Sequence, residues 1–303
     1  MKRNANIIFV FLLIMLAALF LSGCDGNKGG GGNRETRTDF VFPEASGVSV
    51  YDGGSVSIDA SNTKDGYLMV KYSGSANKIK LQITGPDSNT YTYTSHSGDY
   101  ATFPLASGDG SYKVDILEQL SGDMYTLAFS QDIIVALDDE FEPFLYPNQY
   151  VWYTSDTKAI DLGIQLSDKS SNDLDYVEQV YNYVITEIDY DEKKATNVPT
   201  DYIPNIDDTL DSGKGICFDY ASLTAALLRS QGIPTKLVVG YSGPAYHAWI
   251  SVYTEETGWV DDIIEFDGKN WSLMDPTLAA GNSDSSVKKY VGDGSNYTVK
   301  YNY

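Results

Sequence analysis

Residues 213–275 constrain the fold most, because this stretch holds a cysteine, a histidine and an aspartate in distinctive local settings. After Cys217, apolar residues recur at helical spacing, and the pattern ends at Gly232 with Pro234 just beyond. Glycine commonly follows the last residue of a helix, and proline cannot continue one. The pattern therefore predicts a helix over 218–231 with Cys217 at or near its N-terminus.

A cysteine in that position has two interpretations. Backbone N–H groups and the helix dipole stabilise a thiolate there, and the same N–H groups can stabilise a developing oxyanion. The alternative is a small buried side chain, since free cysteine is among the most buried residue types. His247 and Asp275, counted together with Cys217, favour the reactive interpretation.

The segment after the helix predicts strands. Residues 235–241 are β-branched and apolar, and 247–253 alternate so that His247 and Trp249 share one face. Asp267-Gly268 is typical of a hairpin turn, and the strand that follows ends at Asp275. Antiparallel pairing would bring Asp275 close to His247, so that its carboxylate orients the imidazole toward the sulfur. Taken singly, His247 would be a core histidine and Asp275 a turn residue.

Three short motifs together resemble the transglutaminase-like superfamily over roughly residues 170–280: Gly-Ile-Cys before a helix, Tyr-His-Ala-Trp, and Met-Asp-Pro. The resemblance implies a papain-like α+β domain with Cys217 as nucleophile, His247 as general base and acid, and Asp275 as the orienting carboxylate. It also implies an aromatic hydrogen-bond donor to the oxyanion, for which Tyr190 is the matching position; the alternative is an ordinary strand or loop tyrosine. We expect no cofactor and no metal ion.

The N-terminus has the pattern of an export signal. Lys2 and Arg3 precede an apolar run over 7–21, and Leu-Ser-Gly-Cys then ends at Cys24. This ending resembles a bacterial lipobox, which implies cleavage before Cys24 and lipid on its sulfur. The alternatives are an ordinary signal peptide or an anchor helix, for which the apolar run is short. We expect an exported protein held on the outer face of the bacterial cytoplasmic membrane, at the cell surface, by two or more acyl chains.

The cysteine count bears on the role of Cys217, and the net charge limits the classes of partner. The chain has two cysteines, so acylation of Cys24 would leave Cys217 as the only thiol, and catalysis is the simplest reason to keep one in an oxidising space. Cleavage would remove two of the 21 basic residues and none of the 42 acidic ones, giving a net charge near −23. Such a charge argues against nucleic acid as a partner. Acidic clusters such as 138–140 lack EF-hand spacing and are interpreted as solvated loops.

The whole chain divides into four predicted segments: a lipoprotein signal peptide (1–23), a flexible glycine-rich tether (24–38), a β-sandwich domain (39–137) and a transglutaminase-like catalytic domain (138–303). Short alternating segments separated by Asp-Gly, Gly-Pro and Ser-Gly turns predict an antiparallel, immunoglobulin-like sandwich. Residues 173–188 carry a helical pattern, and 196–212 are loop-like and would line the active-site cleft. Residues 283–303 would add an edge strand or fray. His96 lies in a predicted turn and is interpreted as structural or exposed.

The predicted function is a lipid-anchored cysteine hydrolase, a peptidase or amidase that forms a thioester on Cys217. Its partner would be a protein or peptide substrate, with a cell-surface or cell-wall peptide among the candidates. Transglutaminase-type transfer to amines is the first alternative, and a non-catalytic surface binding or scaffold protein is the second. Hydrolysis comes first because no amine-acceptor site is recognisable in the sequence and water needs none.

Overall fold

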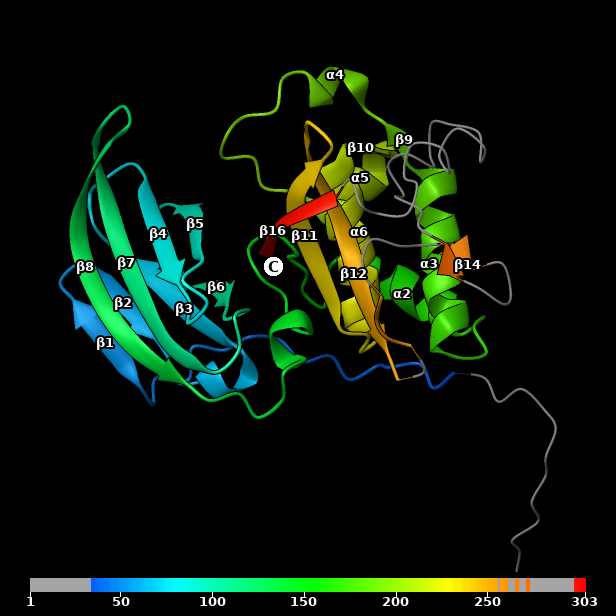
Figure 1. Ribbon diagram of the computed structural model, residues 1–303, viewed down its shortest axis with the longest axis horizontal. Coiled ribbons are helices and arrows are strands. Elements are labelled where there is room, and N and C mark those ends of the chain that lie inside the picture. Colours follow the sequence, from blue (N-terminus) through cyan, green and yellow to red (C-terminus); the bar gives the residue numbers. More distant parts are fainter. Residues whose placement is uncertain (1–33, 256, 261–264, 267–270, 273–296) are drawn as a thin grey trace, which may run out of the picture. The chain divides into compact units, whose positions relative to one another are not determined.

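The N-terminal part of the chain forms two four-stranded antiparallel sheets (Figure 1). The computed structural model describes residues 34–255, 257–260, 265–266, 271–272 and 297–303. The first sheet has the order β1 (Val50–Gly53), β2 (Val56–Asp59), β3 (Tyr67–Tyr72), β6 (Ala101–Pro104). The second has the order β5 (Thr90–Ser95), β4 (Ile79–Thr84), β7 (Gly110–Ser121), β8 (Met124–Val135). Alternate residues of both sheets are buried in a shared core, as half-buried strands require.

The C-terminal part combines helices with a further antiparallel sheet. Its helices are α2 (Lys158–Ser167), α3 (Asp173–Glu187), α4 (Glu192–Ala195), α5 (Ile206–Ser212) and α6 (Cys217–Ser230). The sheet has the order β13 (Gly258–Val260), β12 (Ala245–Thr254), β11 (Thr235–Ser242), β16 (Tyr297–Asn302). Two short pairs complete it: β9 (Asp189–Tyr190) runs parallel to β10 (Lys214–Gly215), and β14 (Glu265–Phe266) pairs with β15 (Trp271–Ser272).

Helix α6 lies at the centre of this part. Every residue from Asp219 to Ser230 is buried, and the helix packs against β11 and β12 on one side and α2 and α3 on another (Figure 1). Gly232 follows with φ at +78°, a backbone conformation that suits glycine at a helix end. The predicted helix and its stop signal are confirmed.

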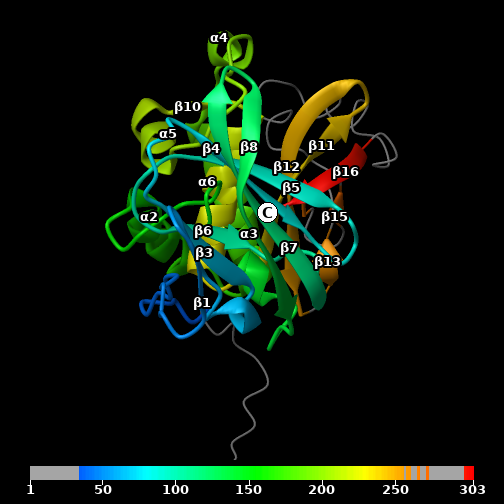
Figure 2. The same ribbon diagram turned by 90° about the vertical axis from the view of Figure 1, so that its left-hand side faces the viewer.

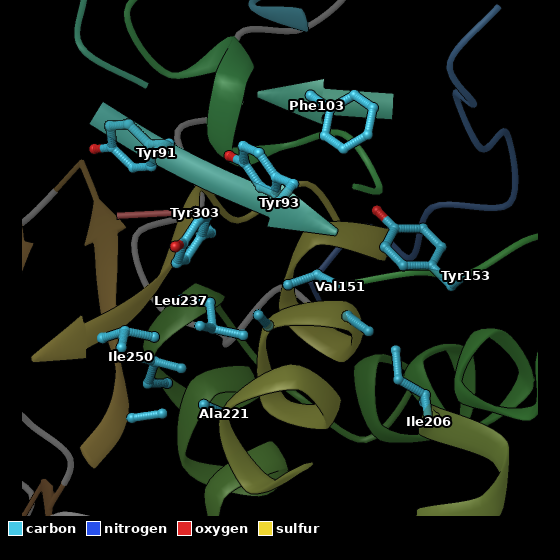
Figure 3. Packing of buried hydrophobic residues seen from close by; sticks show 14 of the residues in the cluster. Tyr91, Tyr93, Phe103, Val151, Tyr153, Ile206, Ala221, Leu237, Ile250 and Tyr303 are labelled. Carbon is cyan, nitrogen blue, oxygen red and sulfur yellow. The ribbon is translucent and has the colours of Figure 1, made fainter. Parts of the chain in front are cut away.

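Aromatic side chains connect the two parts of the chain. Figure 3 shows Tyr93 of β5 beside Tyr303, with ring centroids 5.7 Å apart, and Tyr150 lies 4.7 Å from the Tyr303 ring. The Gln149 amide also donates to the carbonyl of Thr94 at 2.8 Å. Residues 33–303 accordingly form one compact unit.

The α+β class is confirmed in outline by the antiparallel sheets and helices, whereas the immunoglobulin-like topology and the domain boundaries stay predictions. The loop expected over 196–212 is wrong in its last part, because 206–212 form α5. The C-terminal residues form the edge strand β16 on β11, which is one of the two outcomes expected. None of the helices in the described part of the chain has the length and apolar character that a membrane span requires.

Candidate active site

Cys217 is the first residue of α6. Ile216 precedes it with extended backbone angles, and its carbonyl accepts the first helical hydrogen bond from the N–H of Tyr220 at 3.0 Å. The thiol is free and partly exposed, and it lines a cavity of about 600 Å³. The N–H groups of a first helical turn have no acceptor within their helix, so they are available to a negative charge in that cavity.

The first turn of α6 is fixed by the buried carboxylate of Asp219. One oxygen of this carboxylate accepts from the N–H of Ile216 at 2.8 Å and lies 2.7 Å from Lys194 Nζ, and the other accepts from the Tyr202 hydroxyl. Gly215 makes room for it, since a Cβ there would lie 2.8 Å from the Cβ of Asp219. Lys194 belongs to α4 and Tyr202 to the segment between α4 and α5, so Asp219 joins both to the turn that carries Cys217.

His247 lies near the start of β12 and lines the same cavity as Cys217. It pairs with Gly240 of β11, and its ring stacks near that of Trp249 with centroids 6.1 Å apart. The predicted strand is confirmed, but burial does not alternate along it, since all residues from Ala248 to Val252 are buried. His247 lies at the more exposed N-terminal end of β12, where it lines the cavity.

Tyr190 reaches the cavity by a different route. It belongs to β9, which pairs with β10 so that Tyr190 lies opposite Gly215, two residues before Cys217. The N–H of Asp191 donates to the carbonyl of Gly215 at 2.9 Å and holds this register. Tyr190 is half-buried and lines the cavity. Cys217, His247 and Tyr190 thus line one cavity, whereas Asp275 and Cys24 lie outside the described residues.

The remaining walls come from segments far apart in the sequence. They include Thr92 of β5, Tyr150 of the connector, Val198, Pro199, Thr200 and Tyr202 of the segment before α5, and Tyr246, Tyr301 and Tyr303 near the C-terminal sheet. No Lys, Arg, Asp or Glu is among the residues that line the cavity in the described part of the chain. Burial raises the pKa of Tyr150 to about 12, and burial raises that of Tyr246 as well, so both phenols stay neutral near pH 7. The described walls of the cavity thus carry no carboxylate, ammonium or guanidinium group, in a protein with 42 acidic residues.

Several of these residues were not anticipated from the sequence. Asp219 carries a recognisable signal, because an acid three residues after an N-cap commonly bonds back to the cap N–H. Lys194, Tyr202 and Thr92 carry none, since their proximity to Cys217 depends on tertiary packing. α4 and β10 lie toward the same side of the view in Figures 1 and 2, and Lys194 of α4 pairs with Asp219 at 2.7 Å.

His96 is exposed, as expected. Within the described ranges, no group of three or more His, Cys, Asp or Glu side chains is arranged to hold a metal ion.

Comparison with known proteins assigns the domain that holds this site. Residues 160–262 match the family described as the transglutaminase-like superfamily. The chain is 30% identical over 118 residues to the uncharacterized protein YebA of Bacillus subtilis, and 37% identical over 70 residues to a protein-glutamine gamma-glutamyltransferase of Pseudomonas aeruginosa. These matches cover 33% and 18% of this chain, and only 16% and 10% of the two relatives.

Two solved structures are similar at low global scores. The periplasmic domain of TgpA from Pseudomonas aeruginosa has a TM-score of 0.35 at 16% identity, covering 77% of this chain and 92% of that one. Red sea bream transglutaminase has a TM-score of 0.32 at 12% identity, covering 72% of this chain and 48% of that one. The family assignment of the domain rests on the sequence match.

Proposed function

We propose that this protein, whose residues 160–262 match the transglutaminase-like superfamily, is a cysteine hydrolase that cleaves amide bonds through a thioester on Cys217. The observation that carries the proposal is that Cys217, in the first turn of α6, and His247, on β12, line one cavity. A thiol beside an imidazole and a helix N-terminus is the arrangement that activates a cysteine nucleophile.

The proposed reaction has two steps. His247 takes the proton of Cys217, and the sulfur attacks the amide carbonyl carbon, forming a C–S bond. The C–N bond then breaks, and the imidazolium gives its proton to the departing amine, which leaves a thioester. Water then attacks the thioester carbon and forms a C–O bond while His247 takes one of its protons. The C–S bond breaks, and the imidazolium returns its proton to the sulfur, which releases the acid and restores the thiol.

In each step, the negative charge that develops on the carbonyl oxygen of the tetrahedral intermediate must be stabilised by hydrogen-bond donors. We assign this role to the N–H groups of the first turn of α6 and to the hydroxyl of Tyr190, which lines the same cavity. Asp275 keeps its proposed role as the carboxylate that orients His247. The uncharged walls fit a polypeptide substrate whose reacting segment is itself uncharged.

Transfer of the acyl group to an amine is the second candidate. It is favoured by the match to a protein named as a protein-glutamine gamma-glutamyltransferase. An amine would replace water in the second step, with His247 removing its proton. Incorporation of a fluorescent primary amine into a glutamine-containing peptide, lost in Cys217→Ala, would establish transfer and overturn a purely hydrolytic function.

We also propose that the enzyme acts outside the cytoplasm, anchored to the membrane through lipid on Cys24. The lipobox-like ending at Cys24 supports this location. Cys24→Ser should move the protein out of the detergent phase in a phase-partition experiment. If Cys24→Ser and the unsubstituted chain partition alike, and no lipid is found on Cys24 by mass spectrometry, the anchor is wrong.

The pH dependence of Cys217 alkylation tests the catalytic proposal. The full chain carrying Cys24→Ser has Cys217 as its only thiol, so the rate with iodoacetamide reports a single group. We expect rapid alkylation to persist well below pH 8 and to be lost in His247→Ala. A rate that rises only near the ordinary thiol pKa of about 8.5 and does not respond to His247→Ala would favour a non-catalytic binding protein.

A further inference from the structure

A second cavity of about 620 Å³ lies between the N-terminal sheets and α5. It is lined by Tyr100, the β6 residues Ala101 and Thr102, the connector residues Gln149 and Trp152, Thr157, and residues 203–207. Its size is that of an ordinary ligand site. None of the sequence motifs points to it, because its walls come from segments separated by about fifty residues each.

Two residues that line this cavity carry a buried side-chain oxygen with no hydrogen-bond partner among the described residues. Thr102 is 1% exposed, and its hydroxyl oxygen is buried and unpaired. The carbonyl oxygen of the Gln149 side chain is likewise buried and unpaired. Its orientation is fixed, since the amide nitrogen donates to the carbonyl of Thr94 at 2.8 Å and a reversed amide would oppose two oxygens. Unpaired buried acceptors are costly, so a ligand that donates N–H groups would be favoured there.

Apolar side chains are exposed at the same cavity. Trp152 is 46% exposed and Ile203 is 39% exposed. Exposed large apolar residues beside polar groups with unmet hydrogen bonds are typical of recognition sites. Asp207, which also lines the cavity, already accepts from the N–H of Lys158 at 2.9 Å. The cavity therefore offers apolar surface and hydrogen-bond acceptors.

This second cavity adjoins the one that holds Cys217. Tyr202 lines the catalytic cavity and Ile203 the second one, and consecutive Cα atoms are only about 3.8 Å apart. Likewise, Tyr150 lines the catalytic cavity and its neighbour Gln149 lines the second one. The loop between the cavities is held to the N-terminal sheets by an ion pair between Lys78 and Asp201 at 2.6 Å. The two cavities therefore share the walls formed by residues 149–150 and 202–203.

We propose that the second cavity binds the polypeptide substrate at a distance from the reacting amide. An apolar residue of the substrate lies against Trp152 and Ile203, and its backbone N–H groups donate to the Gln149 carbonyl oxygen and the Thr102 hydroxyl. The substrate class is thus an extended polypeptide with an apolar residue a few positions from the amide that meets Cys217. This assignment rests on the proposed function, which places the reacting amide at Cys217. It gives the N-terminal sheets a role in substrate selection.

Tethered alkylation tests the assignment without requiring turnover. The probes are iodoacetyl peptides in which about one to six glycines separate the reactive group from a phenylalanine, a range that covers the reach between adjoining cavities. A second series carries the iodoacetyl group at the other end. The protein is the full chain with Cys24→Ser. We expect one spacer length to react about ten-fold or more faster than iodoacetamide, which corresponds to modest binding. Aspartate in place of phenylalanine should remove the gain.

Three variants locate the binding. Trp152→Ala and Thr102→Val should each remove most of the rate gain, and Thr102→Val should leave the melting temperature unchanged or raise it, because its hydroxyl lacks a protein partner. The matched control is Ile134→Ala, which truncates a side chain 75% exposed on β8 and should keep the gain.

The assignment is overturned if no spacer raises the alkylation rate, or if the gain survives both Trp152→Ala and Thr102→Val. It is also overturned if the oligosaccharide chitohexaose suppresses the gain and an uncharged, phenylalanine-containing peptide does not, because the cavity would then bind a sugar rather than a polypeptide. The iodoacetamide rate and its dependence on His247 test the catalytic proposal in the same samples, so the two failures are distinguishable.

Discussion

The buried carboxylate of Asp219 pairs with the ammonium group of Lys194, with Oδ2 and Nζ 2.7 Å apart. The side chain of Asp219 is fully buried and that of Lys194 is 32% exposed. Because the same carboxylate also accepts from the N–H of Ile216 and the hydroxyl of Tyr202, one group joins the first turn of α6 to the segment that forms a wall of the cavity that holds Cys217. The position of Cys217 relative to that wall depends on this contact.

Lys194→Met tests how much the contact stabilises the fold. It would leave a buried carboxylate without its cation, which we expect to lower the free energy of unfolding by about 1–3 kcal/mol, less than for a fully buried pair because Lys194 is partly hydrated. Urea unfolding measures the change. Lys193→Met is the matched control, since Lys193 is exposed and its loss should cost no more than about 0.5 kcal/mol. Equal effects for the two variants would mean that the ion pair contributes nothing.

The sequence predicted α6 and β12 well because their signals are local. The apolar pattern after Cys217, the glycine at 232 and the alternation through His247 are all contained within single elements. α5 was missed although Asn205 caps it, with its side chain accepting from the N–H of Asp208 at 3.1 Å. With seven residues and a proline just before it, α5 offers too short a pattern to separate a helix from a loop.

The composition of the site was predictable only in part. Cys217 and His247 were found because each lies in a distinctive motif, and Tyr190 because a family resemblance pointed to its position. Thr92 and Gln149 could not be found, because they reach the two cavities only when the N-terminal sheets pack against the C-terminal part. Such long-range packing leaves no pattern in a single sequence.

Tyr190→Phe tests the proposed oxyanion role. Loss of one donor that acts mainly in the transition state should lower kcat about 10²–10³-fold with little change in KM. Tyr246→Phe is the matched control, since it removes a hydroxyl from the same cavity. We expect it to change kcat less than ten-fold, within about 1.4 kcal/mol. If Tyr246→Phe proves as damaging and Tyr190→Phe is neutral, the role belongs to Tyr246.

Alkaline pH should destabilise the protein through its buried tyrosines. The unfolded pKa of tyrosine is near 10, and burial raises that of Tyr150 to about 12, so the fold favours the neutral phenol. Its contribution, on the order of 2 kcal/mol, is fully present below pH 10 and is lost as pH rises through about 12. Urea unfolding at pH 8 and pH 11 measures this loss.

Tyr150→Phe should make that loss smaller, because phenylalanine does not titrate. Tyr241→Phe, which alters a tyrosine 40% exposed, serves as control and should leave the loss unchanged. An identical pH dependence in the Tyr150→Phe variant and the unsubstituted chain would show that Tyr150 is not held neutral by the fold.

Arg229 joins three segments around Tyr303, which lines the cavity that holds Cys217. Its buried guanidinium donates to the carbonyls of Thr235 and Tyr146 at 2.9 Å each and of Tyr303 at 2.6 Å. Arg229→Met would remove the side-chain donor from all three oxygens, although the oxygen of Tyr303 keeps the N–H of Leu237 at 2.9 Å. We expect the free energy of unfolding to fall by about 3 kcal/mol. Arg229→Lys keeps the charge but lacks the planar guanidinium group that can donate to several acceptors at once. Its free energy of unfolding should therefore lie between those of Arg229→Met and the unsubstituted chain. Chemical unfolding of the two variants measures the difference. If lysine restores the full stability, charge rather than the three directed hydrogen bonds holds β16 and the connector in place.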